Sequence, residues 1–429
     1  MTDHTRSDTS RVRAVAGRAG RRAQRAVRDR IVELFTRGGL SFRDLGVAHA
    51  ASTAGDTLVT IALAGTLFFS VPTAEARGNV ALYLLLTVAP FAVIGPALGA
   101  LLDRYPSAYR LTLLWSAVAR AVIALLLIRQ LDSLWLYPFA FTLLVLSRTH
   151  GISRNALVPL VLEEPVTLVN ANARLARIGV YAGAVVAPFG VAVTALIGPG
   201  GALVLSILVY LVAAAAGRRL PGPAPEAGPR STGSPLARLH LPPTVRFAQI
   251  ATAVVRLLNG FLVLLLAFAF REAEAGVADF GALLAAAGAG FALASWVSPI
   301  LEARLREEPM VVAALAVEAA AGFIAAQWFG LLAASGLALA AGFSWGTAKF
   351  AFDGLLQSAI SGHRRGVAFT RSETVFQLAW VIGGVLPTGL PIPPKIGLVI
   401  AGLAALAAQI VYVAHLLTPL NRTADTEPD

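Results

Sequence analysis

Six charged residues fall inside long apolar stretches of the chain, and they are the side chains best placed to do chemistry. A charge in the hydrocarbon interior of a bilayer is costly, so each is a functional candidate by default. A carboxylate there can take up or release a proton, and a guanidinium can bind a carboxylate or an anionic solute. These candidates, with one polar partner, are Asp56, Arg120, Arg256, Glu318, Lys349, Glu373 and Asn259.

Asp56 is the strongest candidate for a proton or substrate site, because protonation would neutralise it and allow a reorientation. The alternative is a pairing or helix-kink residue. Arg120 is expected to pair with Asp56 or to bind an anionic substrate, and Glu318 to line the site or form an ion pair. His49 lies seven residues before Asp56, on the same face of the predicted helix. We expect it either to be a histidine at the helix end whose hydrogen bonds are satisfied or to assist proton movement.

The elements that carry these residues are apolar enough to exclude an ordinary soluble enzyme. Apolar residues make up 57% of the 429 residues and charged residues 14%, where soluble domains carry about 25%. Twelve segments are each near the ~20 residues a helix needs to cross a bilayer. They lie near 43–70, 79–102, 109–131, 134–153, 172–197, 201–217, 245–270, 278–301, 309–329, 331–352, 372–390 and 394–417.

Resident metals and cofactors are not expected. The chain has no cysteine, its six histidines lack metal-ligand spacing, and it contains no GxxxxGK[ST] or G-x-S-x-G motif. We therefore expect neither an enzyme nor an ATP-driven pump, and an ion gradient, of protons, is the expected energy source.

The formal net charge of +11 lies in two stretches, residues 1–43 and 217–246. With both termini cytoplasmic, the inward arm, loops, helix ends and tail hold 28 Lys and Arg, against four on the outward side. The charge thus indicates topology. The basic arm is expected to lie on the anionic inner leaflet or to be a disordered tail, and no nucleic-acid partner is expected.

A Pro-, Gly- and Ser-rich stretch divides the chain into two halves that resemble each other. At a spacing of 199 residues, Asp103 matches Glu302, and the other matches follow at this spacing or at 203. The expected organisation is an arm 1–42, a six-helix bundle 43–217, a linker 218–243, a second bundle 244–418 and a tail 419–429. The further matched pairs are Arg154 with Asp353, Arg174 with Glu373, Pro188 with Pro387, Gly190 with Gly389, Arg43 with Arg246, and Asp56 with Asn259.

The run Gly99-Ala-Leu-Leu-Asp103-Arg104-Tyr105 resembles the signature between helices 2 and 3 of the major facilitator superfamily. Two positions depart from this signature: Leu102 stands where the family has a small residue, and Pro106 stands where it has a glycine. The resemblance spans about residues 43–418 and implies an all-α membrane protein with twelve transmembrane helices in two pseudo-symmetric six-helix bundles. It implies a conformational latch or gate at Gly99, Asp103, Arg104, Arg154, Arg174, Asp353 and Glu373.

Three further segments resemble the exporter-like members of that family. They are Ser52-Thr-Ala-Gly-Asp56, Ser153-Arg-Asn-Ala-Leu-Val-Pro159, and Gly183-Ala-Val-Val-Ala-Pro188-Phe-Gly190, with Pro387 and Gly389 at the matching places of the second half. In this family the first helices of the two halves line the central cavity. The resemblance therefore implies a proton or substrate cavity that includes Asp56, Asn259, Arg120, Arg256 and Glu318.

The expected function is secondary active transport by alternating access in a bacterial plasma membrane. We expect a monomer that exports an amphipathic, apolar or lipid-like small molecule, because the cavity helices are rich in Ala, Leu and Phe. The alternative is a membrane protein that does not pump, such as a lipid scramblase or an accessory subunit of a cell-envelope complex. Lys349 and Asp353 lie four residues apart on one helix face, and we expect them to pair.

Overall fold

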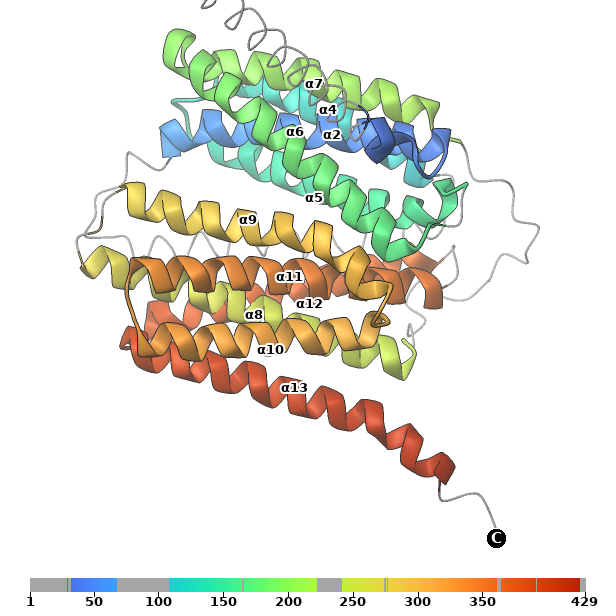
Figure 1. Ribbon diagram of the computed structural model, residues 1–429. Helices are drawn as coiled ribbons and strands as arrows, with labels where there is room; N and C mark the ends of the chain where they lie inside the picture. The colour runs from blue at the N-terminus through green and yellow to red at the C-terminus, as the bar shows by residue number, and fades with distance from the viewer. Residues whose placement is uncertain are drawn as a thin grey trace, which may run out of the picture.

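The computed structural model describes residues 29, 32–67, 108–163, 166–221, 241–273, 275, 277–360, 364–390 and 392–424. Long helices dominate this part of the chain, and it contains no strand (Figure 1). The predicted segment 79–102, the motif residues Gly99, Asp103 and Arg104, and most of the arm and linker lie outside it.

Eleven long helices are described, and each coincides with one of the predicted segments. Eight of them are long and apolar enough to cross a membrane, in agreement with their unbroken hydrophobicity. Their bounds are α2 Leu40–Leu67, α4 Ala108–Leu127, α5 Leu136–Val161, α6 Leu168–Ile197, α7 Pro199–Arg219, α8 Pro243–Glu272, α9 Val277–Glu302, α10 Glu307–Gln327, α11 Leu331–Ala359, α12 Arg365–Gly389 and α13 Pro394–Ala424.

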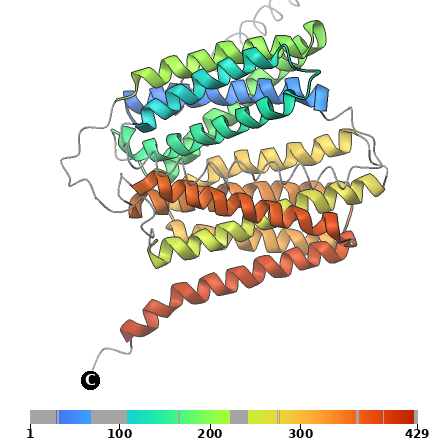
Figure 2. The same cartoon turned by 180° about the vertical axis from the view of Figure 1, so that it is seen from behind.

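The helices form two bundles that lie side by side with their axes roughly parallel. Helices α2 and α4–α7 make one group, and α8–α13 make the other (Figures 1 and 2). In each group the first helix contacts the fifth and sixth transmembrane helices, as α2 does with α6 and α7, and α8 with α12 and α13. The third contacts the fourth and sixth in both groups. This shared pattern confirms the predicted fold class.

Several helices are longer than the apolar segments that predict them. Helix α5 continues to Val161 and α11 to Ala359, so Arg154 and Asp353 both lie within helices, Arg154 beyond the predicted apolar segment 134–153 and Asp353 on one helix with Lys349, as expected. Helix α12 begins at Arg365, and α13 runs on to Ala424, past the expected start of the tail. Hydrophobicity records only the part of a helix that meets hydrocarbon, so polar helix ends escape it.

Glycines let two pairs of helices in the second half approach backbone to backbone. A Cβ on Gly260 of α8 would collide with the Trp380 carbonyl of α12, and one on Gly383 with the Leu257 carbonyl. The same reciprocal contact joins α9 and α11 through Gly290 and Gly342. In a membrane, where helices gain little from the hydrophobic effect, such close packing supplies much of the association energy. These contacts fix the positions of α8, α11 and α12, which carry the charged side chains described below.

Candidate functional site

Asp56 is the centre of a polar cluster in the first half. Its carboxylate accepts hydrogen bonds from the Arg120 guanidinium (2.9 Å), the Ser147 hydroxyl (2.6 Å) and the Tyr210 hydroxyl (2.7 Å). The four residues come from α2, α4, α5 and α7. The Asp56 side chain is 32% exposed, so this carboxylate remains reachable from outside the bundle.

Arg120 is fully buried and has one acidic partner in the described part of the chain, Asp56. It also donates to the Ser52 hydroxyl (2.9 Å) and to the Ser116 carbonyl (3.2 Å), and its guanidinium lies 4.7 Å from the Tyr210 ring centre. Pairing with Asp56, one of its two predicted roles, is therefore present. A buried arginine is tolerated only with such compensation, so the two charges depend on each other.

Asn259, the counterpart of Asp56 in the second half, builds no equivalent cluster among the described residues. Its amide donates to the Val255 carbonyl (3.0 Å) within α8 and lies 3.5 Å from the Ala341 carbonyl of α11. The two halves therefore differ in chemistry at this position, although they share a helix arrangement.

Lys349 is the centre of the charged cluster in the second half. Its ammonium contacts the Asp353 carboxylate (2.5 Å), as the four-residue spacing predicts, and also the Glu373 carboxylate of α12 (2.9 Å). The three side chains are between 5% and 23% exposed. Glu373, predicted as a gate residue, thus contributes to a three-residue ion cluster within its own half.

Arg256 lies beside this cluster on α8 and contacts aromatic rings. Its guanidinium lies 4.5 Å from the Trp345 ring centre and 5.6 Å from that of Trp380. Such stacking is a favourable cation–π arrangement. Within the described residues no hydrogen bond or ion pair of Arg256 is present, and its favourable electrostatic interaction is with Glu373.

Arginines of α5 face the Lys349 cluster from the first half. Arg154 interacts electrostatically with Asp353 and Glu373, and Arg148 with Glu373. Arg154 also contacts the ring of His49 (3.0 Å), which stacks on His150 at 6.3 Å. The structure thus brings His49 to Arg154 rather than to Asp56.

Polar contacts join the two halves at the predicted cytoplasmic end of the helices. Gln357 of α11 donates to the Asn155 carbonyl and accepts from the Asn172 amide, both at 2.8 Å. The Gly366 amide donates to the Tyr109 hydroxyl at 2.9 Å. Sequence reasoning missed Gln357, Tyr109 and Gly366, because neutral polar groups near helix ends carry no distinctive signal, whereas Asn155 belongs to the segment that resembles exporter-like members.

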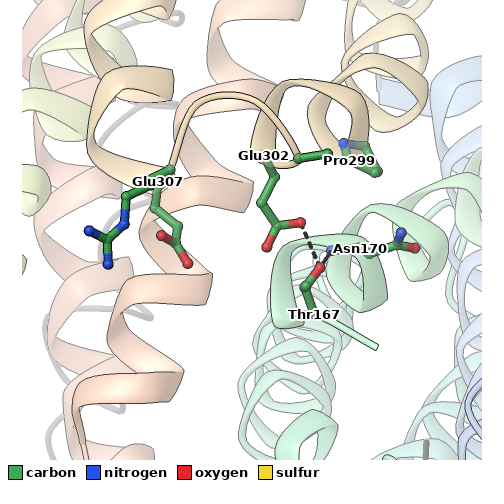
Figure 3. Close-up of a pocket in the computed structure, with 7 residues that line it drawn as sticks. Thr167, Asn170, Pro299, Glu302 and Glu307 are labelled. Atoms are coloured by element: carbon green, nitrogen blue, oxygen red, sulfur yellow. Dashed lines mark hydrogen bonds between the residues drawn. The ribbon is translucent and has the colours of Figure 1, made fainter. Parts of the chain in front are cut away.

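Figure 3 shows a further cross-half contact at this end, where Thr167 donates to Glu302 over 2.6 Å. The two residues line a shallow pocket of about 350 Å³ between the start of α6 and the α9–α10 turn. Nearby, the Arg177 guanidinium of α6 lies 4.6 Å from the Trp296 ring centre of α9. Glu302, recognised only as half of a repeat pair, is therefore a contact between the halves.

The remaining predicted site residues lie apart from these clusters. Glu318 is 2% exposed in α10, and its carboxylate has no hydrogen-bond partner among the described residues, so the ion pair expected for it is not found among them. It lies apart because α10 packs against α11 and α13. Arg174 donates to the carbonyl of Arg37, which precedes the first bundle, and to the side chain of Asn170 in its own half.

The predicted Pro-x-Gly motifs lie within α6 and α12, at Pro188 and Pro387. In α6 the neighbouring glycines bring the helix close to α2. A Cβ on Gly190 would press on Leu58 and Ile61, and one on Gly183 on Thr57. Gly389 of α12 faces open space in the structure. The motif therefore has a packing role in the first half that its counterpart does not share.

Comparison with known proteins finds relatives in mycobacteria, while no family model matches the chain. An uncharacterized protein of Mycobacterium leprae is 31% identical over 372 residues, which cover 77% of this chain and 64% of that protein. Uncharacterized proteins from two strains of Mycobacterium tuberculosis are 39% identical over 142 residues, 32% of this chain and 25% of each. The chain thus spans less than two thirds of these relatives.

Solved transporter structures resemble the chain along most of its length. A bacterial homologue of the iron transporter ferroportin, in an outward-facing state, has a TM-score of 0.65 and 16% identity, covering 86% of this chain and 98% of that one. FucP in its outward conformation has a TM-score of 0.65 and 14% identity, with 87% and 98% covered. The human organic anion transporter MFSD10 has a TM-score of 0.64 and 14% identity, with 86% and 98% covered. At these identities the likeness concerns the fold.

Proposed function

We propose that this multi-pass membrane protein, which has the fold of the major facilitator superfamily, is a secondary active transporter that works by alternating access. The observation that carries the proposal is the set of polar contacts between the halves at one end of the helices. Each contact is a hydrogen bond between one bundle and the other. When the halves separate at this end, water replaces each of these hydrogen bonds, so the free-energy cost of opening is small.

Proton coupling is proposed for Asp56. Its three hydrogen-bond donors come from three other helices, so protonation would weaken a junction between α2, α4, α5 and α7. A carboxylate that is partly exposed and tied to a buried arginine fits a proton acceptor whose state alters packing.

The proposed direction is export, and the proposed substrate is an amphipathic or apolar small molecule. The sequence similarity to exporter-like members at Asp56, Arg154 and Pro188 supports the direction. Apolar and aromatic side chains around Arg256 support the substrate type. We place the protein in a bacterial plasma membrane as a monomer with both termini cytoplasmic, on the distribution of its Lys and Arg residues.

Purified protein in liposomes tests the proposal. Amphipathic fluorescent dyes of both charge signs are entrapped, and their release is followed after a pH gradient is imposed. Release that depends on protein and gradient is expected, and Asp56→Asn should slow it at least tenfold while Asp132→Asn, at an exposed loop carboxylate, leaves it unchanged.

Folding is controlled with the double variant Asp56→Asn, Arg120→Gln, which removes both charges of the pair. Full-rate, gradient-driven release by either Asp56 variant would disprove the proton site. Exchange of phospholipid between leaflets without movement of any dye would instead favour the scramblase alternative.

A further inference from the structure

Glu318 is a buried carboxyl group that the proposed transport cycle does not use. It lies on α10 about 16 Å along the axis from Glu307, where the helix begins, and about 14 Å from Gln327, where it ends. This places it near the middle of a helix that is long and apolar enough to cross a membrane. Glu318 is 2% exposed, and neither carboxyl oxygen has a hydrogen-bond partner among the described residues.

The helices around Glu318 pack closely. One turn before it, the Ser344 hydroxyl of α11 donates to the Ala314 carbonyl of α10 (2.9 Å). One turn after it, a Cβ on Gly322 would lie 3.3 Å from the Gly402 amide nitrogen of α13. Glu318 is therefore held where α10 meets both α11 and α13. The core between these helices is built from apolar side chains, among them Leu337, Ala341, Leu398, Ala401 and Ala405.

Glu318 also lacks a counter-charge in the described part of the chain. None of the described charged side chains acts on it electrostatically, and burial alone influences its ionisation. Helices α8, α9, α11 and α13 all contact α10, and their charged and titratable groups therefore belong to other surroundings. Those with described side chains are Arg246, Arg256, Arg271 and Glu272 of α8, Asp279 and Glu302 of α9, Lys349 and Asp353 of α11, and Lys395, Tyr412 and His415 of α13.

A carboxylate in this position would be costly, because it would have lost its water without gaining a cation or a hydrogen-bond donor. A buried acid without such partners takes up a proton and becomes neutral. Asp56 is the contrasting case, since it is partly exposed and the Arg120 guanidinium and two hydroxyl groups compensate its charge. The two carboxyl groups are therefore expected in different protonation states.

Helix α11 connects the surroundings of Glu318 with the closed end of the molecule. Ser344, which contacts α10 one turn from Glu318, lies thirteen residues before Gln357, about 20 Å along the axis of α11. Gln357 makes hydrogen bonds that hold the two halves together at the closed end. A shift of α11 that breaks these bonds would also move this helix against α10, because packed helices slide as units.

We infer that Glu318 is a second proton site of this protein, neutral while the predicted cytoplasmic end is closed and exchanging its proton when that end opens. The exchange transfers H⁺ from a carboxyl oxygen of Glu318 to water and back, and no other bond forms or breaks. This inference deepens the proposed transport function and rests on it for the role of the proton, which adds to the one proposed for Asp56.

Infrared spectroscopy tests the protonation state, because the C=O stretching band of a carboxylic acid is separate from the bands of carboxylates. The purified full chain is studied in an ester-free detergent at about pH 8, where exposed carboxyl groups are ionised. The wild type should show the acid band, and both Glu318→Gln and Glu318→Met should remove it. Glu308→Gln, at the start of the same helix, is the matched control and should leave the band in place.

Transfer into heavy water tests the link to opening, because deuteration of the acid shifts its band. In the described conformation both carboxyl oxygens are shielded from water, so the shift should follow the opening of the molecule. Glu302→Ala, which removes the Thr167 hydrogen bond at the closed end, should make the shift about fivefold faster. Glu308→Ala is the control and should leave its rate unchanged.

A wild type without the acid band would overturn the inference, as would a band that survives both Glu318 variants. Equal rates of deuteration in Glu302→Ala and Glu308→Ala would also overturn it, because the proton would then exchange without opening. An acid band with opening-dependent exchange, in a protein that releases no dye, would leave the proton site standing and contradict the proposed transport. Gradient-driven release of dye without the acid band does the reverse.

Discussion

At the residue scale, the chain places its few intramembrane charges in two clusters of different character. The Asp56 cluster has one carboxylate and one guanidinium, whereas in the second cluster the Lys349 ammonium contacts two carboxylates, those of Asp353 and Glu373. Sequence reasoning predicted the Asp56–Arg120 and Lys349–Asp353 contacts, because an intramembrane charge needs a partner. It missed Tyr210, since a hydroxyl 154 residues from Asp56 has no local signal.

The Asp56–Arg120 pair makes a prediction about stability. Asp56→Asn leaves Arg120 buried without a counter-charge and should lower the free energy of unfolding by about 2 to 3 kcal/mol, allowing for the partial exposure of Asp56. The double variant Asp56→Asn, Arg120→Met should recover at least half of that loss. Denaturant titration in detergent measures both, with Asp132→Asn as the control. A double variant less stable than the single one would contradict the predicted coupling.

At the element scale, helix packing in the second half depends on glycine at four positions. The hydrophobic segments predicted where the helices lie, because length and apolarity follow from the bilayer. They did not predict which helices touch, since Gly260 and Gly383 are 123 residues apart and only the tertiary arrangement brings each against a carbonyl. The polar ends of α5 and α11 were missed because these helices extend beyond the apolar segments from which they were predicted.

Alanine at a close-contact glycine should disrupt this packing. In α11, a Cβ on Gly342 would collide with the Ala287 carbonyl of α9, while a Cβ on Gly336 of the same helix would meet open space. Gly342→Ala should lower the free energy of unfolding by about 2 kcal/mol or more, because the backbones must move apart. Gly336→Ala should be neutral or slightly stabilising. Folded yield and thermal unfolding in detergent compare the two, and equal behaviour would argue against the packing explanation.

At the scale of the whole molecule, the two bundles meet through contacts at the predicted cytoplasmic end. These contacts join α5 and α6 of one half to α9, α11 and α12 of the other, and Tyr109 adds the start of α4. The repeat in the sequence predicted two comparable halves. It did not predict which end is closed, because that depends on weak polar contacts such as those of Gln357.

Weakening the closed end should raise the population of a state open on that side. Ser153→Cys provides a buried reporter on α5, next to Arg154, in a chain without other cysteines, and Glu302→Ala removes the bond to Thr167. Loss of about 1 kcal/mol should increase the open population about fivefold. The rate of labelling by a membrane-impermeant maleimide measures this change. Glu308→Ala is the neighbouring control, and an equal rate in both backgrounds would show that the Thr167 contact does not hold the end closed.

The helix extensions at the predicted cytoplasmic end enlarge the movement that a small tilt of a helix produces at that end. Helix α11 has 29 residues, a length of about 43 Å, against a hydrocarbon core of about 30 Å. Its end therefore stands well outside the hydrocarbon, far from any pivot near the bilayer centre. A tilt of about 10° at such a pivot moves a point 25 Å away by about 4 Å. The second bundle thus acts as a lever whose long arm ends at Gln357, so a slight rotation at the charged clusters is enough to break the hydrogen bonds that close this end.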